Sequence, residues 1–195
     1  MSEVLATNGH RPHPEREPLL VVDALVVEFG TARHGIVHAV SGVDLTIGVG
    51  ETLGVVGESG SGKTTLGRAV MQLVRPTGGS VWLGGQELTA LAGRDLRDAR
   101  GSMQMIFQDP ISSLNPRRTV AELVREGRVI LYGENDPRRD EVVEAVIDAV
   151  DLRPLLDRRP HELSGGQCQR VSLARAIAIE PRLVILDEPV SALDV

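Results

Sequence analysis

The chain has 195 residues, with 21 basic and 27 acidic side chains and a formal net charge of −6. Its longest apolar runs have only four residues, as at 183–186, whereas a membrane-spanning helix needs about twenty, which excludes a span within this sequence. The single cysteine, Cys168, excludes an internal disulfide and an all-cysteine metal site. The acidic balance argues against nucleic-acid binding, and the lack of an apolar N-terminal signal segment favours a cytosolic location.

The first third of the sequence is patterned for β-strands. Residues 1–18 carry three prolines and no periodic apolar face, so we expect a disordered leader. Apolar residues at 19–27 and an alternation through 43–47 predict strands joined by a hairpin loop between Gly30 and Gly35. Residues 53–56 predict a short buried strand that ends in a glycine-rich turn, and a helix should follow from 63 to 73.

The remaining sequence alternates between strand and helix patterns. Short strands are predicted at 81–83 and 103–107, and the apolar spacing becomes helical between 119 and 150, interrupted by Asp136-Pro137. A third helix is expected from Ser164, and the aliphatic run 183–186 is typical of a parallel strand covered on both faces. The sequence therefore predicts an α/β protein with a β-rich N-terminal part and a helical insertion. Because it contains only four aromatic residues, its core should be aliphatic.

A phosphate-binding loop is predicted between the strand at 53–56 and the helix that follows. The pattern G-x-x-x-x-G-K-T spans 57–64 and would arise by chance in about one chain of this size in a hundred. Glycines let backbone N–H groups approach phosphate oxygens, and Lys63 is the only lysine beside 20 arginines, which marks a position where arginine would not serve. The Thr64 hydroxyl could bind Mg²⁺. The candidate phosphate-binding residues are Gly57, Glu58, Ser59, Gly60, Ser61, Gly62, Lys63, Thr64 and Thr65.

Two further motifs indicate catalytic or ligand-binding residues. Asp187 and Glu188 follow the aliphatic run 183–186. Taken alone, such a pair of carboxylates is more often part of a surface turn. In a protein that also has a phosphate loop, Asp187 would hold Mg²⁺ and Glu188 would activate the attacking water. Residues 163–167 read Leu-Ser-Gly-Gly-Gln, where Ser164 is a good helix N-cap. The two glycines weaken a helix start, so they indicate a second anion site rather than a cap alone.

In this order the motifs resemble the nucleotide-binding subunit of an ABC transporter from about residue 19 onward. The resemblance rests on the phosphate loop, Gln108, LSGGQ at 163–167, ILDEP at 185–189 and SALD at 191–194. Residues 105–110, 113–116, 160–163 and 188–194 further resemble the oligopeptide/dipeptide importer branch, which includes nickel importers.

The resemblance implies a P-loop NTPase (RecA-like) core with an N-terminal antiparallel β subdomain and an inserted α-helical subdomain at 110–162, within a nucleotide-binding domain over 19–195. It implies ATP and Mg²⁺ as ligands, with catalytic Glu188, Lys63 and Gln108, and with Thr64, Gln108 and Asp187 on the metal. Phe29 is the candidate for stacking on adenine. Ser164, Gly165, Gly166 and Gln167 would close over the γ-phosphate held by a second subunit, and Asp194 would lie in the loop that bridges the two sites.

The implied partners are a second ABC ATPase subunit, identical or different, two membrane permease subunits and, indirectly, an extracellular solute-binding protein. Nucleic acid is not expected, and the location would be the cytoplasmic face of the cell membrane. The chain would drive import of a small solute, peptides above all.

The sequence stops at Val195, where the family continues with further strands and a switch-loop histidine. We therefore expect the C-terminal strands of the family to be missing here. None of the five histidines is placed to replace the switch-loop histidine, so we expect this chain alone to hydrolyse ATP poorly. Two alternatives stay open: a truncated, non-catalytic ATP-binding product, and a soluble ABC ATPase without a transport role. The short helical insertion favours transport over the second.

Overall fold

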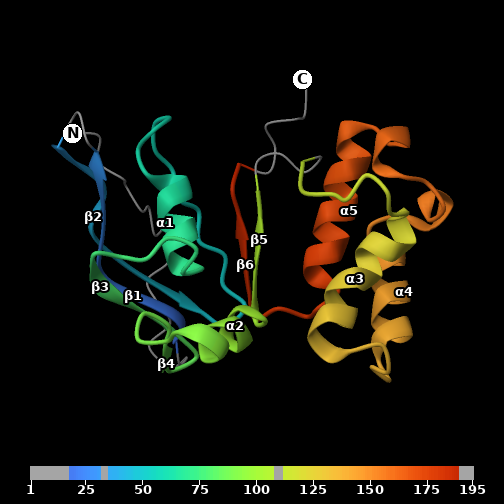
Figure 1. Cartoon of the computed structure of the whole chain (residues 1–195), viewed down its shortest axis with the longest axis horizontal. Helices are drawn as coiled ribbons and strands as arrows, with labels where there is room; N and C mark the ends of the chain where they lie inside the picture. Colours follow the sequence, from blue (N-terminus) through green and yellow to red (C-terminus); the bar gives the residue numbers. More distant parts are fainter. Residues whose placement is uncertain (1–17, 32–34, 108–111, 189–195) are drawn as a thin grey trace. The chain divides into compact units, whose positions relative to one another are not determined.

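The computed structural model describes residues 18–31, 35–107 and 112–188, which form two compact units that divide between Arg97 and Asp98 (Figure 1). The first strand begins at Pro18, so the rest of the expected leader lies outside the described residues. Within the described part of the chain, no helix combines the length and the apolar character that crossing a membrane requires.

The first unit is built on an antiparallel sheet. Its strands, in the order β2-β1-β3-β4, are β1 (Pro18–Thr31), β2 (Gly35–Gly48), β3 (Gly78–Leu83) and β4 (Gln86–Glu87). The expected N-terminal strands are confirmed as one long hairpin, in which Phe29 pairs with Val37 and Leu25 with Val43. Leu25, Val27 and Val81 are fully buried, so the inward face of this sheet is aliphatic as expected.

The predicted helix after the glycine-rich turn is α1 (Lys63–Val70). It buries Leu66, Ala69 and Val70 and ends three residues earlier than expected, because Gln72 takes a left-handed φ of 55° that α-helical residues do not adopt. The helix α2 (Gly93–Arg100) was not predicted, since Leu96 is its only buried residue and its sequence carries no apolar stripe.

The strand predicted at 53–56 is not present. Only Val56 forms a bridge there, its side chain is 67% exposed, and Leu53 and Val55 are partly buried. A strand is defined by a ladder of hydrogen bonds to a neighbour, and an apolar run without such a ladder stays irregular. The expectation of a short buried strand was therefore wrong for these residues.

The second unit packs three helices around one aliphatic cluster. They are α3 (Val120–Tyr132), α4 (Arg139–Ala149) and α5 (Gly165–Ile177), with 3-10 turns η1 (Arg153–Leu155) and η2 (Pro160–Glu162) before α5. The helices predicted between 119 and 150 and from Ser164 are confirmed. The cluster includes Leu123 and Val124 of α3, Ile147 of α4 and Val171 of α5, all at most 2% exposed.

Two parallel strands complete the second unit: β5 (Met103–Ile106) and β6 (Leu183–Leu186). Parallel pairing of 183–186 is confirmed, but coverage of both faces is not. Leu183 is 8% exposed, whereas Val184 and Leu186, which point to the opposite face, are 36% and 51% exposed. The face of β6 that carries Val184 and Leu186 is therefore partly exposed.

Candidate functional site

The glycine loop before α1 has, at two positions, a backbone conformation that strongly favours glycine. Gly60 and Gly62 have φ values of +79° and +97°, in the region that L-residues avoid. A Cβ atom on Gly62 would in addition collide with the backbone carbonyl oxygen of Ala39 in β2. The local fold of the first unit thus requires the second glycine of the motif, independently of any ligand.

Lys63 closes this loop on itself. Its Nζ donates to the carbonyl oxygens of Gly57 and Glu58, both at 2.8 Å, so the ammonium lies inside the loop. Gly62 caps α1 with no side chain, and the first turn of the helix contains no acidic residue. The helix dipole and the ammonium therefore add their positive potentials, which suits a ligand with several negative oxygens.

The loop also holds a buried hydroxyl without a partner. Ser61 Oγ is shielded from solvent and makes no hydrogen bond among the described residues, although Ser61 N donates to Glu58 O at 3.2 Å. The loop is tight, because a Cβ on Gly57 would lie 2.6 Å from Ser61 Oγ. An orphaned buried donor costs about 1–3 kcal/mol, so the loop fits a ligand that supplies an acceptor oxygen, such as a phosphate.

The start of α5 presents the second motif. Ser164 is the N-cap, and a Cβ on Gly165 or Gly166 would meet no atom of the described residues within 4 Å. Both glycines are exposed. Since packing among the described residues does not exclude larger side chains there, the glycines leave the helix N-terminus open for close approach of a ligand.

The two carboxylates follow β6. Asp187 N donates to Ile106 O at 2.9 Å, so Asp187 emerges beside the end of β5. Glu188 is exposed and has a left-handed φ of 48°, a conformation that non-glycine residues adopt only uncommonly. Gln108 lies outside the described residues, but the described strand β5 that precedes it ends level with β6, since Ile106 pairs with Leu186.

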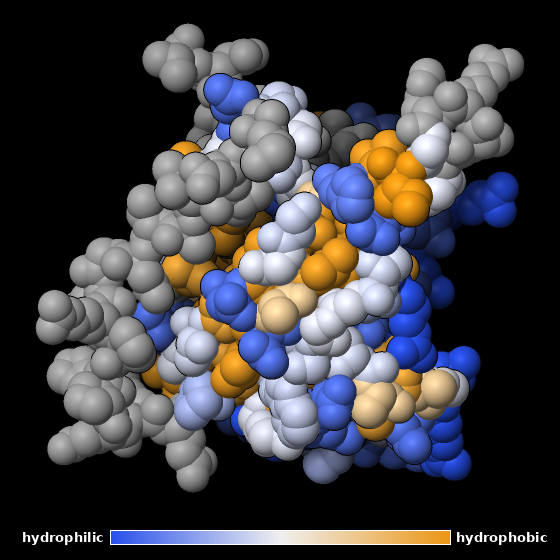
Figure 2. Space-filling model, turned by 90° about the vertical axis from the view of Figure 1, so that its left-hand side faces the viewer, coloured by the Kyte–Doolittle hydropathy of each residue, from blue (hydrophilic) through white to orange (hydrophobic). Residues whose placement is uncertain are grey.

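The predicted site residues divide between the units. The loop 57–65 and Phe29 lie in the first unit, and 164–167 with Asp187 and Glu188 in the second, each described within its own unit. Phe29 is 42% exposed in β1. Figure 2 shows apolar side chains lying between hydrophilic ones on the face that it draws. Among the described residues no three His, Cys, Asp or Glu side chains gather as a metal cluster.

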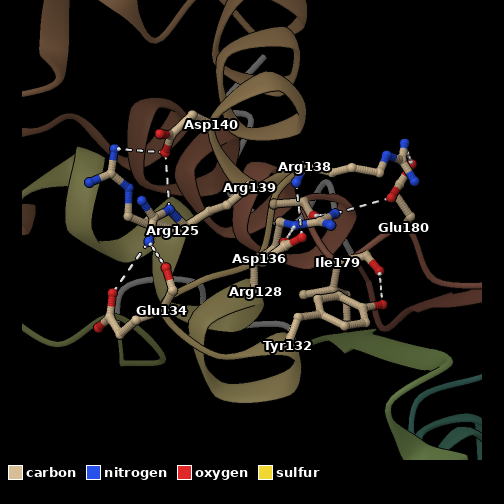
Figure 3. A network of polar contacts seen from close by, with 11 residues as sticks. Arg125, Arg128, Tyr132, Glu134, Asp136, Arg138, Arg139, Asp140, Ile179 and Glu180 are labelled. Atoms are coloured by element: carbon tan, nitrogen blue, oxygen red, sulfur yellow. Dashed lines mark hydrogen bonds and ion pairs between the residues drawn. The ribbon is translucent and has the colours of Figure 1, made fainter.

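A buried polar network in the second unit was not predicted. Arg128 of α3 is 3% exposed and pairs with Asp136 and Glu180 (Figure 3). A signal was present in the sequence, because Arg128 continues the apolar stripe of Val120 and Val124 at helical spacing. An arginine on that stripe indicates a buried, paired guanidinium.

Curated relatives match most of this chain in sequence. OppF, the oligopeptide transport ATP-binding protein of Salmonella typhimurium, is 52% identical over 161 residues, 80% of this chain and 48% of OppF. OppF of Escherichia coli has the same identity and coverage. The chain spans about half the length of the curated relatives it matches.

Solved structures agree on the fold. The dimeric post-hydrolysis structure of the ATP-binding cassette MJ0796 with ADP and Pi superposes with a TM-score of 0.77 at 27% identity, covering 90% of this chain and 76% of that one. CbiO1 of Clostridium perfringens, part of the transporter complex cbiONQ, gives 0.76 at 27% identity, covering 91% and 68%. The predicted α/β class with a P-loop NTPase core is thereby confirmed. The family model described as "ABC transporter" matches residues 40–191, from β2 through the glycine loop and the capped start of α5 to the two carboxylates, and this chain belongs to that family.

Proposed function

We propose that this chain is an ATP-binding and ATP-hydrolysing motor subunit that energises import of a small solute, peptides above all, through a membrane permease. The observation that carries the proposal is the glycine loop, in which Lys63 Nζ and the N-terminus of α1 face the same narrow turn. The Lys63 ammonium, the backbone N–H groups of the loop and the buried Ser61 hydroxyl together suit the terminal phosphates of a nucleotide.

Each residue has a role in this proposal. Lys63 and the amides of 57–65 bind the β- and γ-phosphates, and Phe29 stacks on the adenine. Thr64, Gln108 and Asp187 would hold Mg²⁺, which when bound would supply positive charge to offset that of the phosphates. Glu188 accepts a proton from the water that attacks the γ-phosphate in line.

The proposal includes a second ATPase subunit. The exposed glycines after Ser164 provide an anion site that closes over the γ-phosphate held by that subunit, which is identical to this chain or a sister of it. The dimeric state named for the MJ0796 cassette supports this arrangement. Two permease subunits would anchor the pair at the cytoplasmic face of the membrane, an extracellular solute-binding protein would deliver the solute, and nucleic acid has no part.

The peptide assignment rests on the relatives. OppF of Salmonella typhimurium and of Escherichia coli are named as oligopeptide transport proteins, and both are 52% identical to this chain over 161 residues. A soluble ABC ATPase without a transport role would not co-purify with a hydrophobic permease. Co-purification of such a permease therefore separates the two functions.

The substitution Glu188→Gln, made in the protein as the cell produces it, tests the proposed mechanism of ATP hydrolysis. Binding of radiolabelled ATP with Mg²⁺ should survive, because the amide keeps the shape of the side chain, while turnover falls by about a hundredfold or more with loss of the general base. Glu141→Gln, an exposed charge-neutralising change on α4, should leave both unchanged. Unaltered turnover in Glu188→Gln would refute the assigned role.

A further inference from the structure

Arg128 connects three segments of the second unit through one guanidinium (Figure 3). Its Nε donates to Asp136 Oδ2 at 2.6 Å, and its Nη1 donates to Ala178 O at 3.1 Å and to Glu180 Oε2 at 3.0 Å. Asp136 lies in the α3–α4 loop, and Ala178 is the C-cap of α5. The side chains of Arg128 and Asp136 are only 3% and 7% exposed, so this is a buried pair.

Contacts of Arg128 and its neighbours also hold the turn between α5 and β6. Tyr132, whose ring lies 4.8 Å from the Arg128 guanidinium carbon, donates through its hydroxyl to Ile179 O at 3.2 Å. Glu180 has a left-handed φ of 55°, and its carboxylate is held by Arg128 on one oxygen and by Arg138 on the other. A non-glycine residue keeps such a backbone only where its surroundings fix it.

The turn at Glu180 leads directly into β6. Arg182 N donates to Ser102 O at 2.8 Å two residues after Glu180, which starts the pairing with β5. The strand then runs four residues to Asp187, whose N–H donates to Ile106 O. The turn at Glu180 thus lies at one end of the paired strand, and Asp187 lies at the other.

We infer that Arg128 is a positioning residue for the carboxylates after β6, acting through the Glu180 turn from the far end of the strand. Stability alone does not explain the pair, since a buried ion pair is often matched or exceeded by apolar residues of similar volume. What an apolar residue cannot do is bind a carbonyl at the end of α5, a carboxylate in the following turn and a carboxylate in the α3–α4 loop together. This inference rests on the proposed function for the role of Asp187.

The test compares two charge-neutral double variants of the purified chain. Arg128→Met with Asp136→Asn removes the buried pair without leaving a lone buried charge. Arg153→Met with Asp148→Asn is the matched control, because Arg153 of η1 and Asp148 of α4 form a pair of the same residue types in which both side chains are more than half exposed. Amide hydrogen exchange over 182–187, without nucleotide, should become about tenfold faster in the first variant and stay unchanged in the second.

A second readout separates positioning from stability. The gain in ATP affinity on adding Mg²⁺, measured against EDTA well below the melting temperature, should fall about tenfold in the Arg128 variant with the EDTA affinity unchanged. Asp187→Asn should give the same loss. A lower melting temperature with unchanged exchange and unchanged magnesium gain would overturn the inference. Were the parent chain to bind no ATP, the proposed function would fail, and hydrogen exchange alone would decide whether Arg128 positions β6.

Discussion

Ser164 and Gln167 bind each other's backbone at the start of α5. Ser164 Oγ accepts from Gln167 N at 3.3 Å, and Gln167 Oε1 accepts from Ser164 N at 2.9 Å. The same reciprocal pair forms at α3, where Thr119 Oγ1 accepts from Glu122 N at 3.3 Å and Glu122 Oε2 accepts from Thr119 N at 2.7 Å. The two helices of one unit thus begin in the same way, and only α5 continues with two glycines.

This pair of caps separates stability from function. Ser164→Ala and Thr119→Ala should each lower the free energy of unfolding by about 1 kcal/mol, because each removes one capping acceptor. Urea denaturation measures that loss. Only Ser164→Ala should also reduce ATP turnover of the chain assembled with its partner subunits. Equal loss of turnover in both variants would show that Ser164 acts through the cap alone.

The glycines after Ser164 give a prediction of opposite sign. Gly165→Ala and Gly166→Ala should each raise the free energy of unfolding by about 0.5–1 kcal/mol, since alanine favours a helix and its Cβ would meet no atom within 4 Å in the part of the chain that the structure describes. Turnover in the assembled transporter should fall, because a methyl group then stands where a phosphate must approach. Gly62→Ala is the contrasting control and should destabilise the first unit, because its Cβ collides with Ala39 O. A stabilised variant with full turnover would contradict the proposed anion site.

The helices of the second unit could be predicted because their signals are local. Thr119 and Glu122 three residues apart, followed by apolar residues at helical spacing, contain the cap and the buried stripe of α3 within a few residues. Ser164 and Gln167 do the same for α5. The aliphatic run of β6 likewise identifies a parallel strand from its own composition.

What could not be predicted depends on partners distant in sequence. The apolar run at 53–56 resembles a strand, but strand formation requires a neighbouring ladder that the run itself does not specify. Arg128 is buried by groups 8 and 52 residues away, Asp136 and Glu180, so no local pattern reveals its partners. The glycine loop was located by its motif, whereas the contact between Gly62 and Ala39 arises only once β2 lies beside the loop.

Lys63 should be indispensable for nucleotide binding. Lys63→Ala removes the ammonium that lies 2.8 Å from two loop carbonyls, and ATP affinity, measured by isothermal titration, should fall by at least about tenfold. Lys63→Arg should not restore it, because a planar guanidinium does not fit where a compact ammonium bridges Gly57 O and Glu58 O. Arg68→Ala removes an exposed cation from the same helix and should leave affinity unchanged. Full binding by Lys63→Arg would argue against the phosphate role.

The pH dependence of stability should report the buried network. The Arg128 guanidinium holds the pKa of Asp136 below its ordinary 3.8 and that of Glu180 below its ordinary 4.5, chiefly through hydrogen bonds to each carboxylate. Because both values are lowered on folding, their contribution is fully present above about pH 5 and is lost as the pH falls through the folded pKa values. Urea midpoints between pH 7 and pH 3 should therefore fall more steeply for the parent than for the Arg128→Met/Asp136→Asn variant.

Salt distinguishes this network from a surface pair. The carboxylate of Asp148 also has a lowered pKa, through its hydrogen bond with Arg153, but both side chains are more than half exposed. Adding 1 M NaCl should largely remove the acid-dependent difference between the parent and the Arg153→Met/Asp148→Asn control, because screening at that ionic strength acts within about 3 Å. The difference for the Arg128 variant should persist, since Arg128 and Asp136 are shielded from solvent. If salt removed both differences alike, Arg128 would behave as an exposed ion pair, and a buried guanidinium could no longer account for the fixed turn at Glu180.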